Sequence, residues 1–524
     1  MLSNRLRPLF ICVLVLLTAI ASLFGGNTAP AHAFGAISGV VWRDYNLNGV
    51  QDTLEPGVQY ITVSFYDSGG LVAGSPITTD ANGNYTFNYP GSDPTVRVEF
   101  TGLPAYLKPG TQPAPQPRSN GSTVQFVTPG ATNVNLGVQN PSEFCQNNPD
   151  VISTCFIPGD HTGAQATDPV VVNFQYNAGD PSQPYVAAHD DTGYGIGVHP
   201  VKVPHAEVGA VYGLAYQRAS KFIFAGASLK RNSDFGPSGI GAIYKINDTT
   251  GSATLASLFY DFGAAAGSTA GRTIPVGSTR DQDTWAYNLV GTISLGGMDI
   301  LEDPVNSAND ALYVVNLNNR TLNKIVINAG ATAGAVSTYS MPLALPGARQ
   351  GCVAADVRPY GLGTHDGKVY VGLVCSAQSS QDVSQLRAYV YSFDPASAAF
   401  STAPVFEYGL NYTRGCASGG GGNPSTCVAS GKNPIPWLPA ASPVITTGEP
   451  IVKIQEVLTD IAFNNGDMIL GFRDRFGDQY RGARTAGDIV LACLVKGVYT
   501  LENNGSCGGK TSAGGVGNSQ GPGG

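Results

Sequence analysis

Residues 44–55 carry the spacing of a twelve-residue calcium-binding loop. Oxygen-bearing side chains occupy the first, third, fifth, ninth and twelfth places, and Gly49 occupies the sixth, where such a loop turns sharply. The seventh place contributes its main-chain carbonyl. The predicted ligands are Asp44, Asn46, Asn48, Val50 through its main chain, Asp52 and Glu55. Ca²⁺ takes six to eight oxygens, and this spacing wraps them around one point, so the sequence predicts a Ca²⁺ site.

The flanks of this loop indicate strands rather than helices. Trp42 ends an alternating apolar stretch, and Pro56-Gly57 follows the final Glu and blocks a helix there. The loop is therefore expected between two β-strands. The alternative interpretation is an Asx-rich hairpin turn, in which Asp and Asn side chains only cap main-chain groups.

Short alternating segments surround the loop. They are separated by turn clusters such as Asp67–Gly70 and Asp80–Gly83, which is typical of a β-sandwich. The predicted strands are residues 36–42, 61–67, 84–89, 95–100 and 134–139. The sequence thus predicts an immunoglobulin-like sandwich over residues 34–139.

This module resembles the B-type repeat of the serine-aspartate (Sdr) surface adhesins. The resemblance is carried by the loop, by Gly39–Trp42, by Glu55–Gly57 and by Thr79–Phe87. It covers nearly all of residues 36–139, and it implies a calcium-stabilised, immunoglobulin-like domain. It also implies that Asp80, and less directly Asp67, completes a calcium site near the loop. The alternative for Asp80 is that it only opens the Asp-Ala-Asn-Gly turn.

The rest of the chain continues the β pattern. Residues 140–165 are predicted to be a linker, residues 166–505 a β-propeller-like domain, and residues 506–524 a Gly-rich tail. Four segments repeat a strand, a short break and a second strand, followed by a third strand. The repeats begin at Gly213, Gly297, Gly361 and Asp460. Because these starts are unevenly spaced, we expect long inserted loops or further blades.

The second domain loosely resembles the propeller region that follows B-type domains in large exported bacterial proteins. The supporting segments are residues 211–231, 295–300 with 312–325, 367–377 and 468–479. This resemblance implies an architecture and no particular activity. The fold class expected for the whole chain is all-β.

Two groups of charged residues in this domain are candidates for chemistry. Arg473, Asp474, Arg475 and Asp478 form a dense cluster after an apolar strand, which favours a loop-fixing ion-pair network over a ligand-binding rim. Asp299 and Asp460 are expected at equivalent places in two repeats, in the motifs GMDI and LTDI, and could face one central channel. The favoured alternative is that each carboxylate binds turn backbone, so no catalytic residue is predicted.

The histidines beyond the leader are scattered along the chain. His189 with Asp190 and Asp191 is the best local grouping for a metal or a general base. Surface positions are nevertheless the favoured interpretation for all five, which are His161, His189, His199, His205 and His365. The nucleophile-elbow, zinc-protease and P-loop motifs are absent from the sequence.

The N-terminus predicts a cleaved secretory signal over residues 1–33. Arg5 and Arg7 precede an apolar run, and small residues at Ala31 and Ala33 suit cleavage. The run is short for a membrane span, so no span is expected in the mature chain. Net charge is −8, and it becomes −10 without the two leader arginines. This acidity, with no basic patch, argues against nucleic-acid partners.

Cysteine usage fits an exported chain. After Cys12 leaves with the signal, eight cysteines remain in pairs that are close in sequence. In an oxidising compartment such pairs indicate disulfides rather than zinc. The expected pairs are Cys145/Cys155, Cys352/Cys375, Cys416/Cys427 and Cys493/Cys507.

Together these features predict an extracellular or cell-surface, calcium-binding protein of structural or adhesive type. Its expected partners are calcium and a cell-surface glycan or protein. The alternative is a secreted propeller enzyme, a hydrolase or lyase on glycan-like substrates, with an appended calcium-binding module. Propellers host both kinds of function, so the fold alone does not decide between them.

Overall fold

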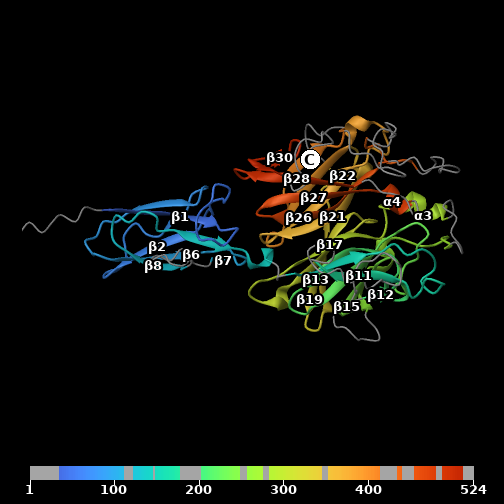
Figure 1. Ribbon diagram of the computed structural model, residues 1–524, viewed down its shortest axis with the longest axis horizontal. Coiled ribbons are helices and arrows are strands. Elements are labelled where there is room, and N and C mark those ends of the chain that lie inside the picture. Colours follow the sequence, from blue (N-terminus) through green and yellow to red (C-terminus); the bar gives the residue numbers. More distant parts are fainter. Residues whose placement is uncertain are drawn as a thin grey trace, which may run out of the picture. The chain divides into compact units, whose positions relative to one another are not determined.

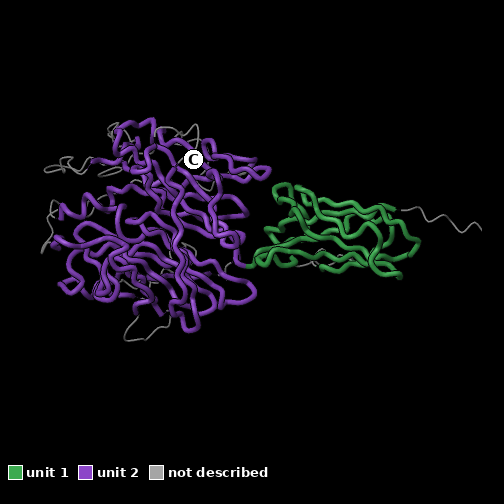
Figure 2. The backbone as a smooth tube through the Cα atoms, turned by 180° about the vertical axis from the view of Figure 1, so that it is seen from behind, with its two compact units in different colours: residues 1–141 green, residues 142–524 purple. Residues whose placement is uncertain are grey.

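A computed structural model describes ten stretches of the chain, which divides into two units by its contacts, Met1–Pro141 and Ser142–Gly524 (Figure 2). The described residues are 35–110, 122–144, 148–176, 202–247, 256–274, 283–344, 352–412, 433–439, 454–479 and 487–511. The predicted signal, His189–Asp191, His199, Cys145 and the Cys416/Cys427 pair lie outside them. No helix in the described stretches is long and apolar enough to cross a membrane.

The first unit is a sandwich of two sheets. One sheet has the order β5-β1-β9-β7, and the other has the order β3-β2-β6-β8 with β4 added beside β2. The β1–β9 pair is parallel, and the other pairs are antiparallel. The strands are β1 (Ala36–Arg43), β2 (Thr62–Asp67), β3 (Gly70–Leu71), β4 (Ile77–Thr78), β5 (Asn84–Asn88), β6 (Val96–Thr101), β7 (Lys108–Pro109), β8 (Val124–Val127) and β9 (Leu136–Gln139).

Alternation in the sequence explains why these strands bury one face. In β5, Tyr85 and Phe87 point inward while their neighbours are exposed, and β6 and β8 alternate in the same way. The ring of Phe65 on the opposite sheet stacks on Phe87 with centroids 4.2 Å apart. One apolar core therefore holds the two sheets together.

The second unit contains four consecutive antiparallel sheets, each starting from one first strand. These first strands, β13, β17, β21 and β26, pack side by side in chain order (Figure 1). The first two sheets are β13 (Val211–Gln217), β14 (Phe222–Ala227), β15 (Ala242–Asn247), β16 (Ala256–Asp261), and β17 (Leu295–Leu301), β18 (Ala311–Asn316), β19 (Thr321–Asn328), β20 (Thr332–Ser340). The next two are β21 (Val357–His365), β22 (Lys368–Cys375), β23 (Arg387–Asp394), β24 (Ala399–Phe400) with β25 (Phe406–Gly409), and β26 (Glu456–Asn464), β27 (Asp467–Asp474), β28 (Gly487–Val495), β29 (Val498–Leu501).

The predicted all-β class is confirmed by this organisation, and the four successive sheets match the repetition expected from the sequence, while a propeller stays a prediction. A further sheet precedes the four, with β10 (Asp150–Thr154), β11 (Pro169–Gln175) and β12 (Lys202–Pro204) in that order, and β10 packs against β13. Strand β10 falls inside the segment expected to be a linker, so that part of the expectation is wrong. The helices are short: α2 (His205–Val208), α3 (Thr284–Leu289) and α4 (Phe476–Gln479).

The four first strands share a β-bulge, and three of the four bulges contain glycine. In each strand the register with the second strand shifts by one residue, at 212–213, 296–297, 360–361 and 459–460. A Cβ added at Gly213 would lie 2.5 Å from the Gly296 carbonyl oxygen, and one added at Gly361 would lie 2.8 Å from that of Leu458. The glycines therefore allow the backbones of neighbouring sheets to approach closely.

Two of the predicted disulfides lie within the described residues. Cys352 bonds to Cys375 at the end of β22, and Cys493 of β28 bonds to Cys507. Cys507 belongs to a small hairpin of β30 (Ser506–Cys507) and β31 (Lys510–Thr511). Residues 506–511 are thus folded against the last sheet, although the sequence predicted a flexible tail from residue 506.

Candidate functional site

The predicted calcium loop begins at the end of β1, and main-chain pairing joins its two ends. The Arg43 N–H donates to the Pro56 carbonyl at 2.9 Å, and Trp42 pairs with Gly57 as an antiparallel bridge. Asp44 continues the pairing with β9, because its N–H donates to the Val138 carbonyl at 2.9 Å. The first predicted ligand is thereby fixed to the sandwich.

Main-chain N–H groups hold the side-chain oxygens of the first half of the loop. The carboxylate of Asp44 accepts from the N–H groups of Asn48 at 3.1 Å and Gly49 at 2.8 Å. Asn46 Oδ1 accepts from Asn48 N at 3.0 Å, and Asn48 Oδ1 accepts from Val50 N at 2.7 Å. Gly49 has a φ of 71°, in the left-handed region that the sharp turn requires.

The second half of the loop closes with two carboxylates. Glu55 Oε1 accepts from the N–H of Tyr45 at 2.8 Å, and Oε2 accepts from that of Asp52 at 3.0 Å. Asp52 Oδ2 accepts from the side-chain amides of Asn46 at 2.7 Å and Asn48 at 2.9 Å. Glu55 therefore spans both ends of the loop, and Asp52 faces the two asparagines across it.

The donor set fits a hard divalent cation. Asp44 is 1% exposed and Glu55 is 7% exposed, so two of the three carboxylates are buried. In the described part of the chain, no ion pair joins Asp44, Asp52 or Glu55 to a lysine or arginine. Buried carboxylates without a cationic partner are costly, and a Ca²⁺ ion surrounded by oxygens would offset that cost.

Asp80 and Asp67 each serve a local turn. Asp80 Oδ1 accepts from the N–H groups of Asn82 at 2.9 Å and Asn84 at 2.8 Å. Asp67 Oδ1 accepts from Gly69 N at 2.8 Å, and its Oδ2 accepts from the Tyr89 hydroxyl at 3.1 Å. Turn formation thus accounts for both residues, and a calcium contact by Asp80 stays a prediction.

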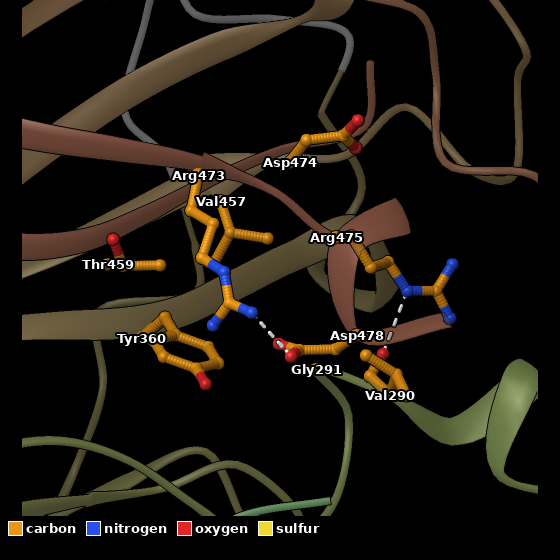
Figure 3. Close-up of a pocket in the computed structure, with 9 residues that line it drawn as sticks. All are labelled: Val290, Gly291, Tyr360, Val457, Thr459, Arg473, Asp474, Arg475 and Asp478. Atoms are coloured by element: carbon orange, nitrogen blue, oxygen red, sulfur yellow. Dashed lines mark hydrogen bonds and ion pairs between the residues drawn. The ribbon is translucent and has the colours of Figure 1, made fainter. Parts of the chain in front are cut away.

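In the second unit, a polar cluster lies beside a small cavity that is lined by residues of β21, β26, the end of β27, α4 and the segment after α3 (Figure 3). Arg473 Nη2 lies 2.5 Å from Asp478 Oδ1, and the Arg473 guanidinium lies 5.3 Å from the centre of the Tyr212 ring. Tyr212 meets Tyr360 edge to face at 5.4 Å. Lys230 is buried nearby and donates to the Val211 carbonyl at 2.9 Å, and burial lowers its pKa to about 8.

The neighbouring Asp474 and Arg475 fix main-chain segments in place. Asp474 Oδ1 accepts from the N–H groups of Gln455 and Phe476, both at 2.9 Å. Arg475 Nε donates to the Val290 carbonyl at 2.8 Å (Figure 3). The favoured interpretation of residues 473–478 as a network that fixes loops is confirmed by these contacts.

Asp299 and Asp460 both bind backbone, as the favoured interpretation has it. Each carboxylate accepts from the next N–H, Ile300 at 2.8 Å and Ile461 at 2.9 Å. Asp299 Oδ2 also accepts from the N–H and the hydroxyl of Thr364, both at 2.8 Å. The two are not equivalent: the bulge register aligns Asp460 with Gly297, two residues before Asp299. The sequence motifs GMDI and LTDI suggested equivalence wrongly, because Asp460 belongs to the bulge and Asp299 follows it.

Asp299→Asn is expected to remove a pH-dependent loss of stability. Burial raises the pKa of Asp299 to about 6 from 3.8, hydrogen bonds from Thr364 and Ile300 oppose this, and the charge of Asp460 adds to it. The folded state binds the Asp299 proton more tightly than the unfolded state does. Protonation of Asp299 therefore stabilises the fold fully below about pH 4, and this stabilisation is lost as pH rises through about 6. The loss is at most about 3 kcal/mol.

Guanidinium unfolding of the second unit at pH 4, 5, 6 and 7 measures this effect. The free energy of unfolding of D299N should change less over this range than that of the parent. D460N is the matched control, because it keeps Asp299 while removing the neighbouring charge. In D460N the pH at which the free energy of unfolding falls should therefore be lower than in the parent. If the free energy of unfolding changed with pH equally in D299N and in the parent, the loss of stability would not come from Asp299.

The structure corrects the prediction of surface positions for two histidines. His205 is fully buried and His365 is 9% exposed, with the latter stacked on Phe463 at 4.3 Å. Two clusters of His and acidic residues also emerge, Glu143–His365–Asp366 and Asp160–His161–Asp234. Sequence reasoning missed both, since in each cluster the third residue, Glu143 or Asp234, is distant in the sequence from the adjacent pair.

Residues 35–145 match the model of the SdrD B-like domain family, which confirms the resemblance of the first module. Serine-aspartate repeat-containing protein D of Staphylococcus aureus (strain Newman) is 38% identical over 99 residues, covering 18% of this chain and 7% of that protein. The first unit is therefore an SdrD B-like, immunoglobulin-like sandwich.

Similarity over nearly the whole chain extends to the colossins of Dictyostelium discoideum. Colossin-C is 30% identical over 497 residues, covering 91% of this chain and 44% of that protein. Colossin-A is 27% identical over 498 residues, covering 90% of this chain and 4% of that protein. The chain thus spans less than half the length of these relatives. Among solved structures, an endo-arabinase from Bacteroides thetaiotaomicron overlaps 59% of this chain and 83% of its own, with 10% identity and a TM-score of 0.28, too low to support an argument.

Proposed function

We propose that this chain is an exported cell-surface protein of structural or adhesive type, in which Ca²⁺ stiffens the first unit. The observation that carries the proposal is the loop 44–55, whose oxygens match the calcium spacing and whose buried carboxylates Asp44 and Glu55 have no basic partner in the described structure. Similarity to a serine-aspartate repeat protein and to colossins supports the surface or adhesive class.

In this proposal the second unit presents its loops to a cell-surface glycan or protein. Its central charged groups are engaged in holding backbone, as Arg475 and Asp299 do, which favours a structural role over catalysis. The disulfides Cys352–Cys375 and Cys493–Cys507 suit an oxidising, extracellular compartment. The N-terminal leader predicted over residues 1–33 would direct export.

Glu55→Gln is expected to abolish the calcium response of the first unit. Its carboxylate supplies the twelfth-position ligand, which binds Ca²⁺ through both oxygens, and an amide cannot do so. With a dissociation constant of about 10⁻⁴–10⁻³ M, 5 mM Ca²⁺ should stabilise the parent by about 1–2.3 kcal/mol. Calorimetric unfolding of the chain in chelator and in calcium, with calcium titration, measures both effects.

The matched control is Glu99→Gln, which removes a carboxylate of the same unit that pairs with Arg97 at 3.0 Å, outside the loop. It should keep the full calcium response. The calcium proposal fails if the parent unfolds identically in chelator and in calcium, or if E55Q responds as E99Q does.

A further inference from the structure

Three loops of the second unit meet beside the sheet that β10 begins. They are the segment after β10, the start of α2, and the connection between β14 and β15. Gly159 and Ser233 form a parallel bridge, in which Gly159 N donates to the Asn232 carbonyl at 2.6 Å and Asp234 N donates to that of Gly159 at 3.0 Å. Asp234 in turn accepts from Ala210 N through its own carbonyl at 2.8 Å. These main-chain bonds fix the side chains that follow.

Three of those side chains bring potential metal ligands together. His161 Nδ1 lies 2.9 Å from Asp234 Oδ2 and 3.7 Å from Asp160 Oδ1, and one ligand atom from each residue lies within 4.8 Å of the others. The remaining oxygen of Asp234 accepts from Phe235 N at 2.9 Å, and Asp160 Oδ1 accepts from the N–H and hydroxyl of Thr162. The backbone therefore orients both carboxylates.

His205, at the start of α2, lies beside this group. It is fully buried, and neither ring nitrogen makes a hydrogen bond of good geometry in the described structure, although one lies near the Asp234 main chain. Leaving such a group unsatisfied costs about 1–3 kcal/mol. Its ring nitrogens fall outside the set of ligand atoms that lie within 4.8 Å of one another. His205 is therefore a buried neighbour of the site and not one of its proposed ligands.

We propose that His161, Asp234 and Asp160 bind one divalent transition-metal ion of the Zn²⁺ class. The ligand atoms of these three residues lie within 4.8 Å of one another. Zinc binds imidazole nitrogen and carboxylate oxygen at about 2.0–2.2 Å, so tetrahedral ligand atoms lie roughly 3.3–3.5 Å apart. The distances from His161 Nδ1, 2.9 and 3.7 Å, bracket that value. The imidazole ligand favours Zn²⁺ over Ca²⁺, which prefers oxygen ligands.

The proposed ion would link two segments that are distant in the sequence. Asp160 and His161 lie in the segment that follows β10, and Asp234 lies in the β14–β15 connection. Zinc would therefore fasten the sheet of β10–β12 to the sheet of β13–β16.

The test is Zn²⁺ binding by the tag-free chain, measured by competition with a chromophoric chelator and by elemental analysis after dialysis. We expect one Zn²⁺ per chain at this site, and Co²⁺ in its place should give the visible absorption of a tetrahedral ion. H161Q and D234N should each weaken binding by on the order of 100-fold. Both side chains are 23% exposed, so these variants should fold.

Two controls separate this site from the other candidate metal sites. H365Q changes the Glu143–His365–Asp366 cluster, and E55Q changes the calcium loop, so both should bind Zn²⁺ like the parent. The proposal is overturned if the parent binds no Zn²⁺ at about 100 μM, or if H161Q and D234N bind like the parent. It is also overturned if binding is lost in H365Q instead.

Discussion

Arg475→Ala is expected to destabilise the second unit by about 3–5 kcal/mol, because it leaves several buried carbonyls unsatisfied. Arg475 is 2% exposed. Its guanidinium donates to the carbonyls of Val290 at 2.8 Å and Asn288 at 2.9 Å and to Gln455 Oε1 at 3.1 Å. It also lies 4.3 Å from the centre of the Trp437 ring, a cation–π contact that alanine loses.

Arg475→Lys should recover little of this loss. Lysine keeps the charge, but its single ammonium cannot reach three acceptors arranged around a planar fork. The matched control is Arg387→Ala, because Arg387 is 40% exposed and lies 3.7 Å from Glu407. An exposed pair of this kind contributes at most about 1 kcal/mol.

Guanidinium unfolding followed by tryptophan fluorescence measures these differences. Trp285 and Trp437 report on the second unit, and Trp42 reports on the first. If R475A and R387A unfolded at the same denaturant concentration, the hydrogen bonds of Arg475 would not be essential for the stability of the second unit.

Asp44→Ala is expected to cost the first unit about 3–5 kcal/mol in saturating calcium. Two effects add: the ion loses a ligand, and the N–H groups of Asn48 and Gly49 lose the carboxylate that accepts them. In chelator the cost should be smaller, because only the hydrogen bonds are lost. Relief of repulsion from Asp52 and Glu55 then also opposes the loss.

Calorimetric unfolding in 5 mM calcium and in chelator separates the two effects. Glu99→Ala is the control, since it shortens a carboxylate of the same unit outside the loop. If D44A unfolded like E99A in calcium, Asp44 would be neither a calcium ligand nor an essential cap of the loop.

Local patterns predicted the first unit well. The strands expected at 36–42, 84–89 and 95–100 correspond to β1, β5 and β6, because period-two alternation marks a half-buried strand. Strands β3, β4, β7 and β8 were missed. The first three have two residues each, too few for any periodicity, and β8 has only four, so pairing with a longer strand defines them.

Long-range pairing explains the features that the sequence could not supply. Strand β10 is a five-residue segment in a polar region, and only its pairing with β11 reveals it. The register of Asp460 depends on a bulge that is defined by the partner strand β27. Asp234 lies beside Asp160 and His161 because two distant loops meet, and no local spacing in the sequence predicts that contact.

The glycines of the shared bulge have a consequence for how mutational scans of this protein should be interpreted. A side chain at Gly213, Gly297 or Gly361 would collide with the backbone of the neighbouring first strand. These positions should therefore reject every replacement, including alanine, as completely as a reactive centre would. Intolerance to substitution at these glycines of the first strands would then reflect how closely two sheets approach, and it would not locate a substrate site.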